Sequence, residues 1–179
     1  VANGADFGIS VDPDVDRLAL ICENGQPFGE EYTLVSVADY LLSRIYNEAL
    51  ETGKSIEEIA APYQMVTSSN LSSSRALRDV TEQYGGEYCT AAVGEVNVTT
   101  KMREAGALIG GEGNGGVIYP ALHYGRDAMV GVALFLTNLA YKKMKVSELR
   151  ASYPEYVIAK NKIELSDSAL IDRILEEVK

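Results

Sequence analysis

Three aspartates stand at alternate positions near the start of the chain, in the stretch DFGISVDPDVDRLALI. Asp12, Asp14 and Asp16 follow one apolar run, and a second apolar run comes directly after them. Pro13 lacks a backbone N–H and does not fit a helix interior, so the segment is expected to be a turn or an extended loop. At a spacing of two, alternate carboxylates in such a loop can converge on one point. Three like charges held together need a hard divalent cation, and the pattern therefore predicts a Mg²⁺ site.

The same aspartates allow other interpretations. A calcium loop of the EF-hand kind would need a turn glycine at its sixth position, which is Arg17, so that interpretation fails. A phosphatase of the haloacid-dehalogenase type, whose nucleophilic aspartate follows an apolar strand in a D-x-D pattern, stays open as a rival. Against it, the chain returns at once to a strand-like run, and no later paired-aspartate metal motif is present. Solvated loop aspartates without an ion are the third interpretation.

A second polar motif, GGEGNGG, occupies residues 110–116. Its five glycines leave Glu112 and Asn114 as the side chains able to contact a ligand, and glycine lets the backbone approach that ligand closely. A carboxylate and an amide can pair directionally with sugar hydroxyls. Taken alone, the motif is equally well explained as a flexible glycine turn.

The elements that must carry these motifs alternate between strand and helix signals, which predicts a layered α/β architecture. A polar connector at 51–62 is the best boundary between two units, and the helix from residue 71 is expected to be capped by Asn70 or a following serine. The strand signals lie at residues 7–11, 17–22, 62–68, 87–93, 107–111, 117–120 and 153–165, and the helix signals at 30–50, 71–84, 97–106, 127–143 and 166–179.

Composition limits the partners. With 179 residues, 46% of them hydrophobic, the chain can bury one good core or two small ones. A net charge of -10 argues against nucleic acid or an anionic membrane surface as a partner and favours a cation. Cys22 and Cys89 are expected to be buried free thiols, which fits a cytoplasmic protein. The most apolar stretch, residues 128–140, has the length of a core helix rather than a membrane span. The chain begins directly with a strand signal, so we expect it to be a fragment.

The stretch from residue 5 to residue 31 resembles the metal-binding loop region of the α-D-phosphohexomutases, the phosphoglucomutase, phosphomannomutase and phosphoglucosamine mutase superfamily. The later GGEGNGG resembles the sugar-binding loop of that family. The family's metal loop usually reads Asp-Gly-Asp-x-Asp-Arg, and Pro13 here replaces the glycine. By this resemblance the three aspartates are the Mg²⁺ ligands, and Arg17 is a catalytic residue near the phosphoryl group.

The resemblance implies a layered α/β/α fold with a mixed sheet, like the third domain of the family, plus a partial second α/β unit. Residues 1–55 would be the end of the metal-binding domain 2, residues 56–150 the sugar-binding domain 3, and residues 151–179 a linker and the start of domain 4. The implied reaction moves a phosphoryl group between the 1 and 6 positions of a hexose or hexosamine phosphate through a phosphoserine, an isomerase-class phosphotransfer. The phosphoserine loop and the phosphate-gripping loop, which the family carries in domains 1 and 4, do not occur in these residues, so the chain alone is expected to be inactive.

Two departures from the family pattern leave the sugar undecided: many members carry serine where Asn114 stands and histidine where Gly116 stands. The implied substrate-binding residues are Glu112 and Asn114. A non-catalytic module that binds sugar phosphate or metal is the rival of another class. Weaker candidates for the site are His123, Glu95, Lys101, Arg126 and Asp127, the last of which is also expected to cap the helix that follows it.

Overall fold

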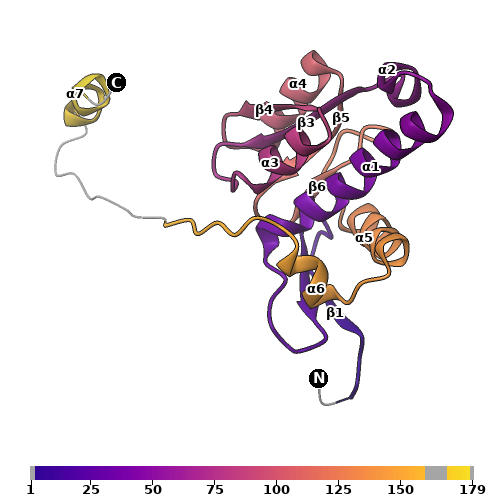
Figure 1. The fold of residues 1–179 in the computed structure, drawn as a ribbon. Helices are drawn as coiled ribbons and strands as arrows, with labels where there is room; N and C mark the ends of the chain where they lie inside the picture. The colour runs from indigo at the N-terminus through magenta and orange to yellow at the C-terminus, as the bar shows by residue number, and fades with distance from the viewer. Residues whose placement is uncertain (1–2, 160–168, 178–179) are drawn as a thin grey trace.

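A computed structural model describes residues 3–159 and 169–177 of the chain. In this part the strands form one two-stranded and one four-stranded sheet, and helices pack around them (Figure 1). The elements are β1 (Phe7–Val11), β2 (Leu18–Cys22), α1 (Glu30–Thr52), α2 (Ile56–Ala60), β3 (Gln64–Asn70), α3 (Ala76–Gln83), β4 (Glu87–Ala91), α4 (Glu95–Ala105), β5 (Ala107–Glu112), β6 (Gly116–Ile118), α5 (Ala128–Lys142), α6 (Val146–Ala151) and α7 (Ala169–Glu177).

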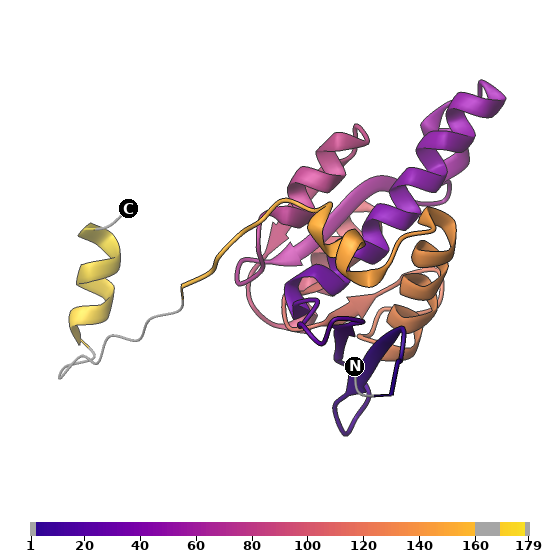
Figure 2. The ribbon, with the colours of Figure 1, turned by 60° about the horizontal axis from the view of Figure 1, so that its bottom comes forward.

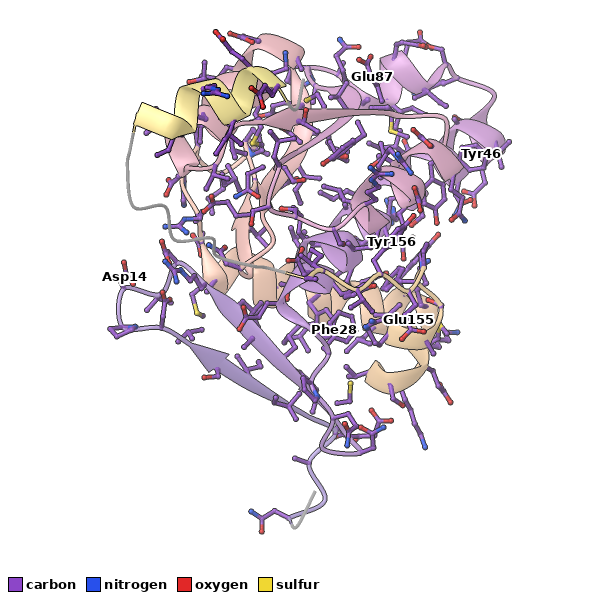
Figure 3. The ribbon with its side chains drawn as sticks, turned by 90° about the vertical axis from the view of Figure 1, so that its left-hand side faces the viewer. Asp14, Phe28, Tyr46, Glu87, Glu155 and Tyr156 are labelled. Atoms are coloured by element: carbon purple, nitrogen blue, oxygen red, sulfur yellow. The ribbon has the colours of Figure 1, made fainter. Side chains whose placement is uncertain are left out.

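The aspartates lie on the turn of an antiparallel hairpin. β1 pairs with β2 from Phe7 opposite Cys22 to Val11 opposite Leu18. The hairpin projects from one side of the molecule (Figure 2), and Asp14 lies on the loop at its end (Figure 3). The predicted arrangement of strand, aspartate loop and strand is therefore confirmed. We call residues 12–17 the aspartate loop.

The four-stranded sheet is mixed, as predicted. Its order is β4-β3-β5-β6, with β3, β4 and β5 parallel and β6 antiparallel to β5. Helix α4 covers one face, while α1 and α3 cover the other and α5 packs against α1 (Figure 1). Parallel strands need crossover connections, and α3 and α4 supply them. The fold is thus the layered α/β/α arrangement.

The larger hydrophobic core joins the hairpin to this body. Leu18 and Leu20 of β2 are buried in one cluster with residues of α1, α5 and β5. Phe28, which precedes α1, meets the ring of Phe135 edge to face at 5.2 Å. A smaller cluster, which includes Met102 of α4, fills the other face of the sheet. The core therefore fixes the base of the hairpin, and with it the aspartate loop, against the sheet.

The start of α3 corrects one prediction. The helix begins at Ala76 rather than residue 71, and no side chain caps it. The side chain of Asn70 instead accepts hydrogen bonds from the Ser72 backbone N–H (3.1 Å) and the Ser73 hydroxyl (2.9 Å). An asparagine that bonds the backbone two residues ahead favours a turn over a helix, and this delays the helix.

Two other segments differ from prediction. The connector at 51–62 contains the short helix α2, because Ser55 and Glu58 form a reciprocal capping box at its start. Residues 153–159 form no strand, and residues 160–165, which complete that prediction, lie outside the described residues. Cys22 is buried as predicted, whereas Cys89 is only half-buried, and both are free thiols. Among the described helices, none has both the length and the apolar character that crossing a bilayer requires.

Side-chain hydrogen bonds hold residues 153–156, here called the C-terminal strap, in place of strand pairing. The Tyr153 hydroxyl donates to the Asp39 carboxylate (2.8 Å). The Tyr32 hydroxyl donates to the Pro154 carbonyl (2.8 Å) and accepts from the Tyr156 backbone N–H (3.0 Å). Because Tyr32 of α1 pairs with one backbone acceptor and one backbone donor of the strap, the strap runs beside that helix as an extended segment. Tyr156, labelled in Figure 3, is partly buried and packs against the larger core.

Candidate metal and sugar site

The three aspartate carboxylates converge. Asp12, Asp14 and Asp16 each offer an oxygen within 4.8 Å of the others. The loop is shaped by Asp12, whose Oδ1 accepts hydrogen bonds from the backbone N–H groups of Asp16 (3.1 Å) and Arg17 (2.9 Å). Val15, which stands between Asp14 and Asp16, has a φ of 58°, a left-handed conformation that few β-branched residues adopt. The local backbone is thus bent so that alternate side chains gather on one side.

The electrostatics of the loop fit a cation. The backbone N–H of Arg17 holds the pKa of Asp12 below its usual range. Burial, together with the hydrogen bond to Asp12, raises the pKa of Asp16. Oδ1 of Asp16 is buried and has no hydrogen-bond partner among the described residues. Nε of Arg17 lies 3.6 Å from this oxygen. A carboxylate oxygen without a hydrogen bond, beside two further carboxylates, belongs to the kind of donor set that a hard divalent ion uses.

The glycine loop, residues 110–116, is the turn between β5 and β6 and lies against the hairpin. The backbone N–H of Leu18 donates to the carbonyl of Gly115 at 3.1 Å. Gly115 has a φ of 88°, and a Cβ there would stand 2.3 Å from the Leu18 carbonyl oxygen. Only glycine permits this approach. The structure therefore brings together the two motifs, which are almost a hundred residues apart in sequence.

Glu112 is more firmly held than the glycine-rich sequence suggested. The residue is 5% exposed, and its Oε1 accepts from the side-chain amide of Asn70 at 2.7 Å. Its Oε2 accepts from Arg126 at 2.9 Å and, at 3.4 Å, from the side-chain amide of Asn114. Asn114 in turn accepts the backbone N–H of Gly116 at 3.1 Å. These contacts orient the Glu112 carboxylate and the Asn114 amide together.

Arg126, a weak candidate on sequence grounds, lies at the centre of the site. It comes just before α5, and its side chain is 14% exposed. Besides Glu112, the guanidinium contacts Asp16 Oδ2 through Nη2 and Glu95 Oε2 through Nε, the latter at 3.0 Å. Burial works against the charge of Arg126, but the three carboxylates, Asp16 foremost, raise its pKa. A sequence signal did exist: a lone arginine beside a helix N-cap in so acidic a chain.

A cleft of about 290 Å³ opens beside the aspartate loop. Asp12, Arg17 and Asn114 line it, as does Glu30 of the first turn of α1, which sequence analysis did not single out. The Arg17 guanidinium is 3.7 Å from Asp12 and 3.6 Å from Asp16, and its side chain is 53% exposed. Arg17 can therefore reach a ligand in the cleft while staying near the carboxylates.

The remaining candidates have local roles. The His123 ring bonds the Asp127 carboxylate through Nε2 at 3.0 Å and accepts the Gly125 backbone N–H through Nδ1 at 3.1 Å. Asp127 caps α5 by accepting the Val130 backbone N–H, as predicted, and this bond lowers its pKa. Lys101 pairs with Glu104 on the surface of α4 at 3.7 Å. None of these contacts of His123, Asp127 and Lys101 involves Arg126 or its three carboxylate partners.

Comparison with known proteins gives consistent matches. The family model for phosphoglucomutase/phosphomannomutase, alpha/beta/alpha domain III, matches residues 32–156. The chain is 32% identical to the phosphoglucomutase/phosphomannomutase of Thermococcus kodakarensis over 98% of its own length and 35% of that protein. A solved phosphoglucomutase/phosphomannomutase family protein from Burkholderia thailandensis superposes with a TM-score of 0.67 at 26% identity, over 87% of this chain and 30% of that one.

A more distant structure has the same fold. The N-acetylphosphoglucosamine mutase of Aspergillus fumigatus, solved in complex with GlcNAc-6P and magnesium, matches with a TM-score of 0.59 at 13% identity. The match covers 82% of this chain and 33% of that one. The chain thus spans only about a third of the length of the relatives it matches.

Proposed function

Because this chain belongs to the phosphoglucomutase/phosphomannomutase family, we propose that it forms part of a Mg²⁺-dependent phosphohexomutase. The whole enzyme would move a phosphoryl group between the 1 and 6 positions of a hexose or hexosamine phosphate through a phosphoserine on another part of the protein. One observation carries the proposal. The aspartate loop and the glycine loop meet at Arg126 and at the bond between Leu18 and Gly115, beside one cleft.

In this proposal Asp12, Asp14 and Asp16 hold the Mg²⁺. The backbone bonds to Asp12 favour its ionised form and fix the loop, and Oδ1 of Asp16, which has no hydrogen bond among the described residues, would complete an all-oxygen donor set. A bound Mg²⁺ would offset negative charge on the phosphoryl group during transfer. Arg17, half-exposed at the cleft, would contact the phosphate oxygens with its fork of N–H donors.

We propose that Glu112 and Asn114 orient the sugar. Asn70 and Arg126 fix the Glu112 carboxylate, so its remaining acceptor capacity can meet a hydroxyl at little entropic cost. The names of the relatives include mutases of glucose, mannose, glucosamine and N-acetylglucosamine phosphates, and whether the sugar is glucosamine, mannose or glucose stays open. We also propose a cytoplasmic location, in keeping with the free thiols.

The proposed order of regions is the metal-binding part in residues 1–55, the sugar-binding part in residues 56–150 and a lead into a further domain in residues 151–179. The division at residue 55 stays a prediction. The family model begins at residue 32, and α1 shares a core with β5, which favours grouping that helix with the sugar-binding part.

Calorimetric titration with Mg²⁺ or Mn²⁺ tests the metal site. We expect binding to be lost or strongly weakened in Asp14→Asn and Asp16→Asn, because each change replaces an anionic oxygen ligand by a neutral amide. Asp6→Asn, an exposed position before β1, is the matched control and should bind as the unaltered protein does. Unchanged binding in both loop variants would contradict the three-carboxylate site.

The two rivals make different predictions. A phosphatase of the haloacid-dehalogenase type would release phosphate in a burst and trap an aspartyl-phosphate at Asp12. A binding module would hold metal or sugar phosphate without turnover even when all parts of the protein are present. Mass spectrometry of the protein after incubation with a sugar phosphate, and a coupled mutase assay on the full-length protein, separate these outcomes.

A further inference from the structure

Arg126 connects three segments of the site. Its three guanidinium nitrogens contact Asp16 of the aspartate loop, Glu112 of the glycine loop and Glu95 at the start of α4. A guanidinium presents its donors as a rigid planar fork, so one position satisfies all three carboxylates. A movement of Arg126 toward or away from one of them must change its contacts with the other two.

The two carboxylate oxygens of Asp16 face different surroundings. Oδ2 contacts Arg126, whereas Oδ1 is buried without a hydrogen-bond partner among the described residues. A cation drawn to Oδ1 would compete with Arg126 for the same negative charge, since like charges repel and one carboxylate carries only one unit. The attraction between Asp16 and Arg126 would weaken, and the guanidinium would be held more strongly by Glu112 and Glu95.

Resting on the proposed function, we infer that Arg126 is a positioning residue that makes the glycine loop and the start of α4 respond to a divalent cation at the aspartate loop. Metal binding and sugar binding would then be linked: the cation sets how firmly the carboxylate that orients the sugar is held. Linkage of this kind is reciprocal, so the sugar would also change the affinity for the cation.

Gly116 supports this role independently. Its missing side chain leaves room for the stem of Arg126, because a Cβ at this position would stand 2.5 Å from Cδ of the arginine and 3.1 Å from Cγ. The backbone of Gly116 does not have a positive φ, so alanine could adopt it. The same Cβ would stand 3.1 Å from Oδ1 of Asn114, so Gly116→Ala should push the arginine stem aside and crowd the Asn114 amide while leaving the charge of every group in place.

Magnesium titration followed by amide NMR on the whole 179-residue chain tests the inference. In the unaltered protein we expect shifts in two places: at Val15 and Asp16 in the aspartate loop, and at Gly94 and Glu95 at the start of α4. The second place is informative because the contact between Glu95 and Asp16 runs through Arg126. The glycine loop is a poorer probe, since the bond between Leu18 and Gly115 also joins it to the hairpin.

Three variants at Arg126 and Gly116, with one control, distinguish the effect of the position of the guanidinium from the effect of its charge. Arg126→Gln removes the link, Arg126→Lys keeps the positive charge without the fork, and Gly116→Ala displaces the stem. We expect all three to keep the aspartate-loop shifts and to lose those at Gly94 and Glu95. Arg44→Gln removes the same charge about 20 Å along α1 from its first turn, and it should behave as the unaltered protein. The variant Gly116→Ala keeps the test decisive if Arg126→Gln does not fold.

Three results would overturn the inference. Shifts at Gly94 and Glu95 that persist without Arg126 would show that the field of the cation reaches α4 directly. Aspartate-loop shifts in the unaltered protein with none at Gly94 and Glu95 would show that no link exists, while leaving the metal site intact. If no residue shifts with Mg²⁺, the metal site of the proposed function fails and the inference fails with it.

Discussion

Hydrogen bonds hold the carboxylate of Glu112 in place but do not use all of its acceptor capacity. A carboxylate can accept about four hydrogen bonds, and contacts with Asn70, Arg126 and Asn114 account for three of them. The anchors hold the side chain in one orientation, and the remaining capacity is what a sugar hydroxyl would use. The distinction between a structural and a sugar-orienting residue therefore needs kinetics and stability to be measured together.

Glu112→Gln keeps the size of the side chain and removes its charge. In the full-length enzyme we expect kcat/KM to fall by the equivalent of about 1.5 to 3 kcal/mol, the range for hydrogen bonds to a charged group. Steady-state kinetics and thermal melting are measured on the same preparations, with Glu82→Gln on the exposed face of α3 as the control. A variant that melts several degrees lower with kcat/KM intact would show Glu112 to be structural.

Individual site residues could be predicted from the sequence where their spacing is recognisable. Residues whose place in the site depends on tertiary packing were given little weight or were missed. Asp12, Asp14 and Asp16 were predictable because the period of two in a loop is a local property. Arg126 was only a weaker candidate and Glu30 was not identified, since their place in the site depends on how β6 and α1 pack, which no spacing records. The extent of Glu112 burial was missed for the same reason: Asn70 comes from another strand.

Among the elements, α1 carries a buried residue, Asp39, that anchors three other segments of the chain. Asp39 is 3% exposed and accepts hydrogen bonds from the hydroxyls of Tyr84 (2.7 Å) and Tyr153 (2.8 Å). It also pairs with the ammonium group of Lys142 in α5 at 2.8 Å. Burial, and next the charge or hydrogen bond of Asp39, raises the pKa of both tyrosines. One carboxylate thus ties α1 to α3, α5 and the strap.

Asp39→Asn should destabilise the protein. The amide cannot accept from two hydroxyls and an ammonium as the carboxylate does, so at least one of these largely buried groups loses its partner. We expect the free energy of unfolding to fall by about 1 to 3 kcal/mol, the cost of an unsatisfied buried polar group. Urea denaturation measures it, with Glu51→Gln at the exposed end of α1 as the control. Equal midpoints for the two variants would contradict the anchor.

The strap should also show a dependence on pH through Asp79. The hydroxyl of Tyr156 and the guanidinium of Arg78 hold the pKa of Asp79 below its ordinary value. A depressed pKa contributes stability that is present above the ordinary value and is lost as the pH falls through the folded one.

We therefore expect Asp79→Asn to lower the Tm near neutral pH, with a difference from the unaltered protein that shrinks below about pH 4. Tyr156→Phe, which keeps the carboxylate but removes its first donor, should give a smaller effect of the same sign. Differential scanning calorimetry across the pH range provides the measurement. A difference that does not change with pH would mean that the ionisation of Asp79 plays no part.

Sequence predicted most elements where local signals and tertiary packing agree. α1 and α5 lie close to the predicted ranges 30–50 and 127–143, and α5 has the predicted Asp127 cap. The prediction of a strand over residues 153–159 was wrong because the hydroxyl of Tyr32, not a neighbouring strand, pairs with the Pro154 carbonyl and the Tyr156 backbone N–H. Tyr32 belongs to α1, more than a hundred residues away, and no window of sequence contains both segments.

For the whole molecule, the proposed site is divided between this chain and parts that it does not contain. Positioning supplies much of phosphoryl-transfer catalysis, and the implied phosphoserine and phosphate-gripping loops do not occur in the 179 residues. We expect the purified chain to show no interconversion of hexose phosphates in a coupled assay at high protein concentration. Adding an active full-length relative to the same reaction is the control for the assay. Sustained turnover by the chain alone would contradict this division.

The space that Gly116 leaves for Arg126 also predicts how positions 116 and 126 vary among related sequences. A lineage that gains a side chain at position 116 would lose the route of the arginine stem, and one that loses the arginine would no longer need the glycine. Neither change is neutral while the other residue stays as it is, because the three carboxylates would be left without their shared partner. The two positions should therefore be inherited as a pair, with glycine and arginine found together in some branches of the family and replaced together in others.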